Sequence, residues 1–369
     1  MLLGDVGARG RAGVAVAAEL ERVLATRRRD GRPSVVLWLG DNVGPVGPGN
    51  LGRCTPPERA WRARGPAALA GVVRAHAAAG GAVLAALGEQ DWSCGQPELL
   101  LQDAPKGPHP WVMPAHNYLA RVYPDGQVQI AMSCAAGRCT ALPTLPGPLV
   151  ELAVVDSAAW FSPPAEGTPA AARADESLAE QKLLLAALAA QPAEAPRLLV
   201  SHHPLESSGP HGVGGRWSDS GYALHSEPVR VAVDAGLFAG ALSAHDRLVL
   251  AAADVTQATK RSSRYWLKNP VFQVISGAAS LPDARAGMRG WYYFQSTALR
   301  GDLQSSRMGF AELQVRADGF RAVLHRRRAG RWGAGALEIA RDRPPHPVES
   351  RSPVMDPCLD CDPVPPRPY

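Results

Sequence analysis

"RLLVSHHPLESSG", residues 197–209, decides the fold class, because a short apolar run ends there in two adjacent histidines and a proline. Such a run, bounded by polar and turn-forming residues, is typical of a strand that is buried on both faces. His202 and His203 then have two readings. They belong to a turn that happens to contain histidine, or they supply a metal ligand, since neutral imidazole is a common ligand. Partners at the ends of other strands would decide between the two.

The same pattern recurs along the chain. Helical periodicity between the runs predicts amphipathic helices over 11–27, 66–79 and 175–190, the last with Asp175 as its N-cap, while 157–174 reads as a surface loop. This alternation favours an α/β fold, in which polar residues gather at the carboxyl ends of the strands. The other apolar runs and the polar residues that follow them are 35–39 with Asp41 and Asn42, 81–87 with Glu89, Gln90 and Asp91, 151–155 with Asp156, and 247–253 with Asp254.

The remaining segments are richer in strand signals. Residues 118–132 and 309–326 each read as a hairpin around an Asp-Gly turn. From about 341 the chain is rich in proline, which disfavours a packed structure. We therefore expect one domain over 1–330 and a disordered tail over 341–369.

Composition excludes some classes of function. The chain has 369 residues and a net charge of +5, and its basic residues are scattered, which argues against a nucleic-acid surface. No run of about 18 apolar residues is present, so we expect no membrane-spanning helix. "MLLGDVG" (1–7) has no signal-peptide pattern and reads as a strand end. Cys134 and Cys139 bracket four residues, a spacing that suits a small disulfide loop and favours an oxidising, extracytoplasmic compartment.

The order of these motifs resembles the calcineurin-like metallophosphoesterases, and their purple-acid-phosphatase-like branch in particular. The resemblance covers most of residues 1–326 and implies a four-layer α/β/β/α sandwich of two mixed β-sheets flanked by helices. The segments that carry it are "LLGDVG" (2–7), "LGDNVGPVG" (39–47), "LGEQDW" (87–92), "WVMPAHNY" (111–118), "AVVDS" (153–157), "VSHHPLESSGPHG" (200–212), "VISGAAS" (274–280) and "GFAELQV" (309–315).

This resemblance implies a two-metal phosphoesterase, in which a metal-activated water attacks a small phosphorylated substrate. Asp41 would bridge the two metals, Asp5 would bind the first and His202 the second. His203 would lie beside them, in a structural or substrate-facing position. The full candidate set is Asp5, Asp41, Glu89, His202 and Asp254 as metal ligands, His203 as catalytic residue, and Asn42 and His211 as substrate-binding residues.

Several positions depart from the family pattern. Gly44 replaces a tyrosine ligand, Ala252 and Asp254 replace two histidines, and Gln90 replaces the catalytic histidine. Glutamine cannot donate a proton at neutral pH, so acid assistance to the leaving group is lost at that position. The oxygen-rich ligand set favours Mg²⁺, Mn²⁺ or Ca²⁺ over iron or zinc. The alternative is that the site binds no cation. Two hypotheses stay open. One is a divergent metallophosphoesterase with impaired or lost turnover, and the other is an inactive family member that serves as a metal-binding or structural module.

Overall fold

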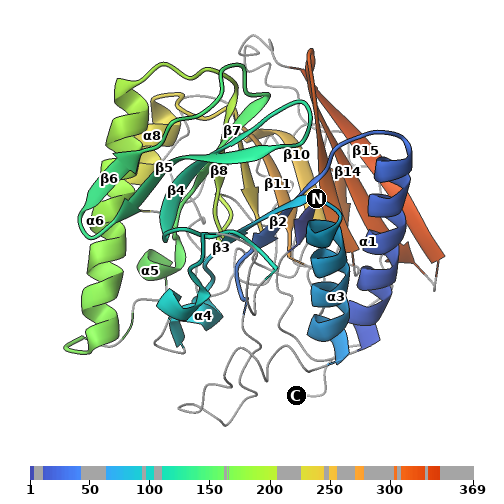
Figure 1. The fold of residues 1–369 in the computed structure, drawn as a ribbon, viewed down its shortest axis with the longest axis horizontal. Coiled ribbons are helices and arrows are strands. Elements are labelled where there is room, and N and C mark those ends of the chain that lie inside the picture. Colours follow the sequence, from blue (N-terminus) through green and yellow to red (C-terminus); the bar gives the residue numbers. More distant parts are fainter. Residues whose placement is uncertain are drawn as a thin grey trace, which may run out of the picture.

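Two mixed β-sheets form the centre of the molecule (Figure 1). The computed structural model describes residues 1–3, 11–42, 64–93, 97–103, 110–161, 164, 166–205, 226–244, 249–255, 271–277, 303–305, 309–328 and 331–340. The first sheet has six strands, in the order β15 (Arg331–Ala340), β14 (Gly319–Arg328), β13 (Gly309–Arg316), β1 (Leu2–Leu3), β2 (Val35–Leu39) and β3 (Ala82–Ala86).

The second sheet has nine strands. Their order is β12 (Leu303–Ser305), β10 (Val249–Val255), β11 (Val271–Ser276), β9 (Gly240–Ser243), β8 (Arg197–Val200), β7 (Val150–Val154), β4 (Asn117–Val122), β5 (Val128–Ala135) and β6 (Arg138–Ala141). Strands β1, β2 and β3 are parallel in the first sheet, and β7, β8, β9 and β11 are parallel in the second. Each sheet therefore has a parallel block whose carboxyl ends lie along one edge.

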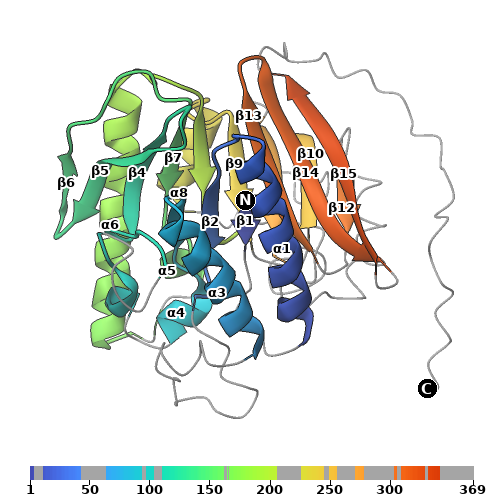
Figure 2. The ribbon, with the colours of Figure 1, turned by 45° about the vertical axis from the view of Figure 1, so that its right-hand side comes forward.

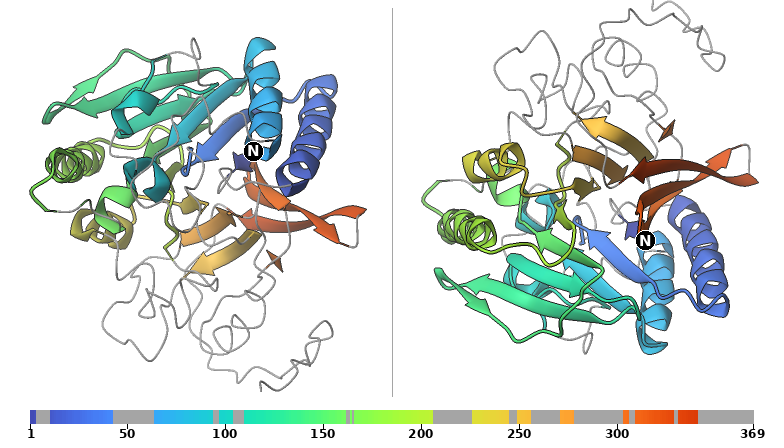
Figure 3. Two further views of the ribbon diagram at one scale, coloured as in Figure 1. Left: turned by 90° about the horizontal axis from the view of Figure 1, so that it is seen from below. Right: turned by 90° about the horizontal axis from the view of Figure 1, so that it is seen from above.

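Helices cover the outer faces of the two sheets. The helices α1 (Arg11–Arg29) and α3 (Arg64–Ala78) lie beside the first sheet, while α6 (Pro169–Ala190) and α8 (Glu227–Asp234) lie beside the second (Figures 2 and 3). One apolar core joins the sheets to each other and to α1 and α3, and a second core lies between the second sheet and α6 and α8. Short helices α4 (Glu89–Ser93), α5 (Ala158–Phe161) and the 3-10 turn η1 (Pro97–Leu100) complete the described elements.

The α/β class, the paired mixed sheets and both predicted hairpins are confirmed. The helices predicted over 11–27 and 66–79 are observed over Arg11–Arg29 and Arg64–Ala78. Strand β15 extends the first sheet ten residues past the boundary expected at 330, because it pairs with β14 along its whole length. The tail over 341–369 lies outside the described residues. No helix in the described part of the chain is long and apolar enough to cross a membrane.

The segment 157–174 was wrongly expected to be a loop with a helix starting at Asp175. It contains α5, and α6 begins six residues earlier than Asp175, because Thr168 caps it. The Thr168 hydroxyl accepts a hydrogen bond from the backbone N–H of Ala171, and Pro169 occupies the first turn, where a missing N–H costs nothing. The Thr-Pro pair was the sequence signal for this start.

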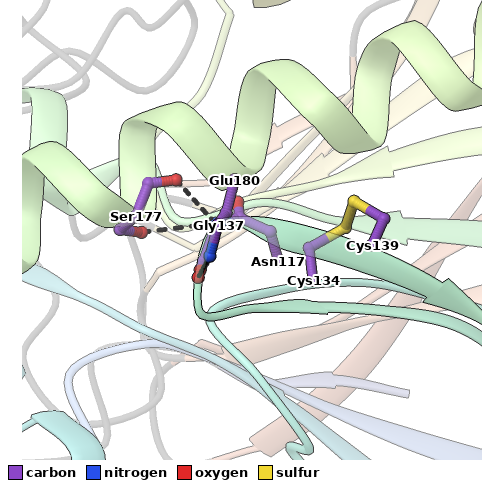
Figure 4. The surroundings of a disulfide bond; sticks show 6 residues. All are labelled: Asn117, Cys134, Gly137, Cys139, Ser177 and Glu180. Carbon is purple, nitrogen blue, oxygen red and sulfur yellow. Dashed lines mark hydrogen bonds between the residues drawn. A yellow bond between two sulfur atoms is a disulfide. The ribbon is translucent and has the colours of Figure 1, made fainter.

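The predicted disulfide between Cys134 and Cys139 is present. The two cysteines are direct partners across the β5–β6 hairpin, beside α6 (Figure 4). Next to them, the backbone N–H of Gly137 donates to Glu180 of α6, whose pKa is raised by burial. The disulfide thus joins β5 to β6, and the hydrogen bond to Glu180 connects this outer edge of the second sheet to its covering helix.

Candidate functional site

The candidate site lies where the carboxyl ends of the two parallel blocks meet. Asp41 follows β2, Glu89 follows β3, and His202 and His203 follow β8. His202 Nδ1 lies 2.8 Å from the carbonyl oxygen of Leu39, the last residue of β2. This hydrogen bond joins the second sheet to the first and places the histidines beside the Asp41 loop.

Glycines at two positions make this close approach possible. Gly40 has φ +87°, and a Cβ atom there would collide with the ring of His202. A Cβ at Gly88 would collide with the backbone and carboxylate of Asp41. Asp41 itself has φ +53°, in the left-handed region that non-glycine residues rarely occupy. The backbone strain at Asp41 is thus held by the packing of three strand ends around it.

The hydrogen bond of His202 fixes its tautomer. A carbonyl oxygen only accepts, so Nδ1 of His202 must carry the proton that is donated to Leu39. In the neutral ring, Nε2 then keeps its lone pair, and this atom lies 3.6 Å from Oδ1 of Asp41. The His202 side chain is fully buried, whereas that of Asp41 is 12% exposed. A backbone carbonyl that orients one ring nitrogen is the usual support of a metal-binding histidine.

Asp41 is also held from the side of β3. The backbone N–H of Gln90, in the first turn of α4, donates to Oδ1 of Asp41 at 2.9 Å. The backbone of Gln90 thus orients the carboxylate whatever side chain stands there.

His203 forms a second group with Glu89. Its Nδ1 lies 2.9 Å from Oγ of Ser157, and its backbone N–H donates to the same hydroxyl at 3.0 Å. Its ring stacks on Phe161, and its Nε2 lies 4.0 Å from Oε2 of Glu89. The Glu89 carboxylate, which sequence reasoning grouped with Asp41 and His202, therefore lies against His203. The rings of His202 and His203 meet edge to face, with centroids 4.9 Å apart.

Asn42 fastens β2 to the loop after β3. Its Nδ2 donates to the carbonyl of Ala86 at 2.8 Å and to Oδ2 of Asp91 at 2.7 Å. The same carboxylate oxygen accepts the backbone N–H of Gly88. Oδ1 of Asn42 is buried and has no hydrogen-bond partner among the described residues. It can therefore accept a hydrogen bond from a bound water or hydroxyl group.

The buried carboxylate of Asp156 supports the candidate site, a role that the sequence did not predict. Asp156 is 1% exposed and accepts hydrogen bonds from the indole of Trp92, the hydroxyl of Ser177 and the first N–H groups of α5. These contacts join α4, α5 and α6 to the end of β7. The position of Asp156 directly after a strand and before a serine was the available signal, but it does not distinguish a structural carboxylate from a ligand.

Tyr118 supports the same region from β4. Its hydroxyl donates to the carbonyl of Ala85 in β3 at 2.6 Å. Burial raises the pKa of this phenol far above its usual range, so it remains a neutral donor. The side chain joins the two sheets close to the candidate site.

The described residues fit part of a metal centre. Asp41 and His202 provide one hard oxygen and one imidazole nitrogen that face each other. Within the described part of the chain no three metal-ligating side chains converge on one point. Asp5 and His211 lie outside the described residues. Asp254 lies inside strand β10, next to a bulge in its pairing with β11, where we had expected it to follow the strand.

Comparison of the chain with models of known protein families and with curated proteins finds no match.

Proposed function

We propose that this chain is a divergent calcineurin-like metallophosphoesterase that holds a hard divalent cation at Asp41 and His202 and has impaired or lost turnover. The proposal rests on the facing pair of Asp41 and His202. His202 Nε2 faces the Asp41 carboxylate at 3.6 Å, and the carbonyl of Leu39 leaves that nitrogen as the acceptor. The two paired mixed sheets with helices outside them agree with the four-layer arrangement of that superfamily.

The chemistry of the donors favours a hard cation. Asp41 offers a carboxylate, and the predicted ligands outside the described side chains, Asp5 and Asp254, are carboxylates as well. Mg²⁺, Mn²⁺ and Ca²⁺ prefer such oxygen ligands. When bound, the cation would supply an activated water and neutralise charge on a phosphate ester. Around it, Gln90 orients Asp41 through its backbone N–H, and Leu39 orients His202.

Two features support impaired turnover. Gln90 stands where the resemblance expects the histidine that protonates the leaving group, and an amide cannot replace it. Glu89 stands where the resemblance expects a metal-binding asparagine, and its carboxylate lies against His203, 4.0 Å from Nε2. General acid catalysis contributes roughly 10²–10⁴-fold in enzymes, so its loss alone would leave slow hydrolysis.

The hydrolysis of an aryl phosphate in the presence of Mn²⁺ or Mg²⁺ tests this function. An aryl substrate suits the test because its leaving group needs little protonation. We expect slow, metal-dependent hydrolysis that Asp41→Asn abolishes. Asp125→Asn is the matched control, because Asp125 is an exposed turn residue that accepts a hydrogen bond from the nearby backbone N–H of Gln127 and lies just before β5, at the other end of the strands from Asp41. Hydrolysis that does not depend on the added metal, or that Asp41→Asn leaves intact, would contradict the proposal.

The second candidate function is a catalytically inactive metal-binding or structural module. The approach of Glu89 to His203 favours it, because the carboxylate that the resemblance would assign to the metal lies 4.0 Å from an imidazole nitrogen instead. Bound metal without any hydrolysis of the aryl phosphate would select this alternative.

A further inference from the structure

The connection from β6 to β7 has a feature that the candidate site does not use. Its sequence is "LPTLPGP" (142–148), and all seven residues belong to the described part of the chain. The connection begins at β6, the outermost strand of the second sheet, and ends at the start of β7 (Figure 2). The candidate site lies at the carboxyl ends of the parallel strands. The segment therefore lies at the opposite end of β7 from that site.

Two prolines determine the backbone conformation of this segment. Pro143 and Pro146 each fix their own φ at about −65°. Each also moves the residue before it, Leu142 or Leu145, toward an extended or polyproline II conformation. A polyproline II helix has three residues per turn, so residues three apart lie on the same side. The two leucines therefore form one ridge, the two prolines form the next, and Thr144 lies on the third side.

The exposure of the side chains has the same period of three. Leu142 is 42% exposed and Leu145 is 51% exposed. Pro143 and Pro146 are exposed as well, whereas Thr144 between them is half-buried. The leucine and proline ridges thus face solvent, and the third side faces the protein.

Hydrogen bonds from β4, β5 and the turn between them hold the third side in place. The guanidinium of Arg121 donates to Oγ1 of Thr144 at 2.6 Å. The backbone N–H of Leu145 donates to Oε1 of Gln129 at 2.8 Å, and the hydroxyl of Tyr123 donates to the carbonyl of Leu145 at 2.6 Å. The segment is therefore ordered before any partner binds.

The carbonyl groups on the exposed side have no such partners. Those of Leu142, Pro143 and Thr144 accept no hydrogen bond from the described residues. Since a polyproline II helix makes no internal hydrogen bonds, its carbonyl oxygens can accept hydrogen bonds from a partner.

We propose that Leu142–Pro146 is a binding segment for a partner protein with an aromatic-lined groove that accepts a polyproline II helix. Such grooves bind proline-rich segments in which two prolines stand three residues apart, and they exploit the low entropy of the preformed helix. Two Leu-Pro pairs, one turn apart, have this arrangement here. Tyrosine and tryptophan in the groove would cover the apolar ridges and donate to the carbonyl groups.

The charge next to the segment adds to the description of the partner. Arg138, at the start of β6, is exposed and has no ion-pair partner among the described residues. A groove with an acidic rim complements this charge. The proposal is independent of the proposed function, because it concerns the opposite end of β7.

The test begins with the free peptide Ala-Leu-Pro-Thr-Leu-Pro-Gly, which is residues 141–147. The peptide selects its binders from a library of SH3 and WW domains, and the selected domain is titrated with the full chain by calorimetry. We expect the chain to bind this domain about threefold to tenfold more tightly than the peptide does, because the hydrogen bonds of Thr144 and Leu145 already order the segment.

Three variants separate the leucine ridge from other surface leucines and from the ordering of the segment. Leu142→Ala/Leu145→Ala should weaken binding of the chain about tenfold or more, because both anchors are truncated. Leu183→Ala is the matched control, since Leu183 is 41% exposed on α6 but is followed by no proline. Tyr123→Phe removes the hydrogen bond to Leu145, so it should lower the affinity toward that of the free peptide.

Several outcomes would overturn the proposal. One is that no domain of the library binds the peptide, and another is that a domain binds the peptide but not the chain. A third is self-association of the chain in sedimentation that Leu142→Ala/Leu145→Ala abolishes, which would assign the segment to a contact between copies. The same double variant should hydrolyse the aryl phosphate as the wild type does, so failure here is distinguishable from failure of the proposed function.

Discussion

At the residue scale, Gly40 shows what the candidate site demands of the backbone. Gly40 and Gly80 have nearly the same φ, +87° and +85°, but a Cβ at Gly40 would meet the His202 ring, whereas a Cβ at Gly80 would meet nothing within 4 Å. In both positions, alanine in the left-handed conformation lowers the free energy of unfolding by about 1–2 kcal/mol. Gly40→Ala should lower the free energy of unfolding by a further 1–3 kcal/mol or so, because it overpacks a buried site. Urea denaturation of the two variants measures the difference, and equal losses would show that His202 does not pack as described.

Gln90 gives a second test at this scale. The backbone N–H of Gln90 donates a hydrogen bond to Asp41. A substitution of the Gln90 side chain leaves this hydrogen bond in place. Under the proposed function, Gln90→His should introduce a proton donor without disturbing Asp41, and raise the hydrolysis of an alkyl phosphate by roughly tenfold or more. Gln90→Asn, which changes the side chain without adding an acid, is the control. If both variants behave like the wild type, the position is not next to the leaving group.

At the scale of elements, Glu312 connects helix α1 to the first sheet. Its carboxylate bonds Arg27 of α1 at 2.7 Å, Gln314 at 3.0 Å and His325 of β14 at 3.1 Å. Burial alone would raise the pKa of Glu312, but these hydrogen bonds outweigh it and lower the pKa to about 2. The shift makes the carboxylate a stabilising group in the folded protein.

This pKa predicts a pH dependence of stability. A carboxyl whose folded pKa lies below its unfolded value stabilises the fold fully above the unfolded pKa of about 4.5, and loses this contribution as the pH falls toward 2. The shift corresponds to about 3 kcal/mol. Between pH 6 and pH 2.5, Glu312→Gln should lose less unfolding free energy than the wild type, by an amount of this order. Parallel pH profiles of the two proteins would contradict it.

The disulfide gives a prediction for the β5–β6 hairpin. Cys134 and Cys139 close a loop of only a few residues, so the chain-entropy contribution is about 2 kcal/mol. The double variant Cys134→Ala/Cys139→Ala should lower the unfolding free energy by about that much. It should leave metal binding unchanged, since the hairpin lies at the outer edge of the second sheet, away from β2 and β8. Loss of metal binding in the double variant would show that the hairpin supports the site.

At the scale of the whole molecule, periodicity and turn signals predicted strands β2, β3, β7, β8 and β10 and the two hairpins, because these depend on local sequence. They missed the strands β6, β9, β11 and β12 of the second sheet. Strand β15 escaped prediction, since its glycines and alanines give no strand pattern and its pairing with β14 alone defines it. The start of α6 depended on the Thr168 cap, which outweighed the more familiar acidic cap at Asp175. Local signals therefore predicted the presence of a helix or strand better than the residues at which it begins and ends.

The candidate site was predicted only in part for a related reason. The order of the motifs brought Asp41 and His202 together correctly, because both follow parallel strands. It could not predict that Glu89 would lie against His203, since that depends on how α4 leaves β3. Nor could it assign Asp156 and Ser157 their supporting hydrogen bonds, which join segments far apart in the sequence.

The most direct test of the central claim is the metal stoichiometry of the purified protein after incubation with Mn²⁺ or Mg²⁺, measured for the wild type, Asp41→Asn, His202→Gln and the Asp125→Asn control. We expect at least one bound cation in the wild type and the control. We expect a large loss of bound cation in the other two variants, because each removes one of the two facing ligands. A wild-type protein that binds no cation, or binding that survives both substitutions, would contradict it.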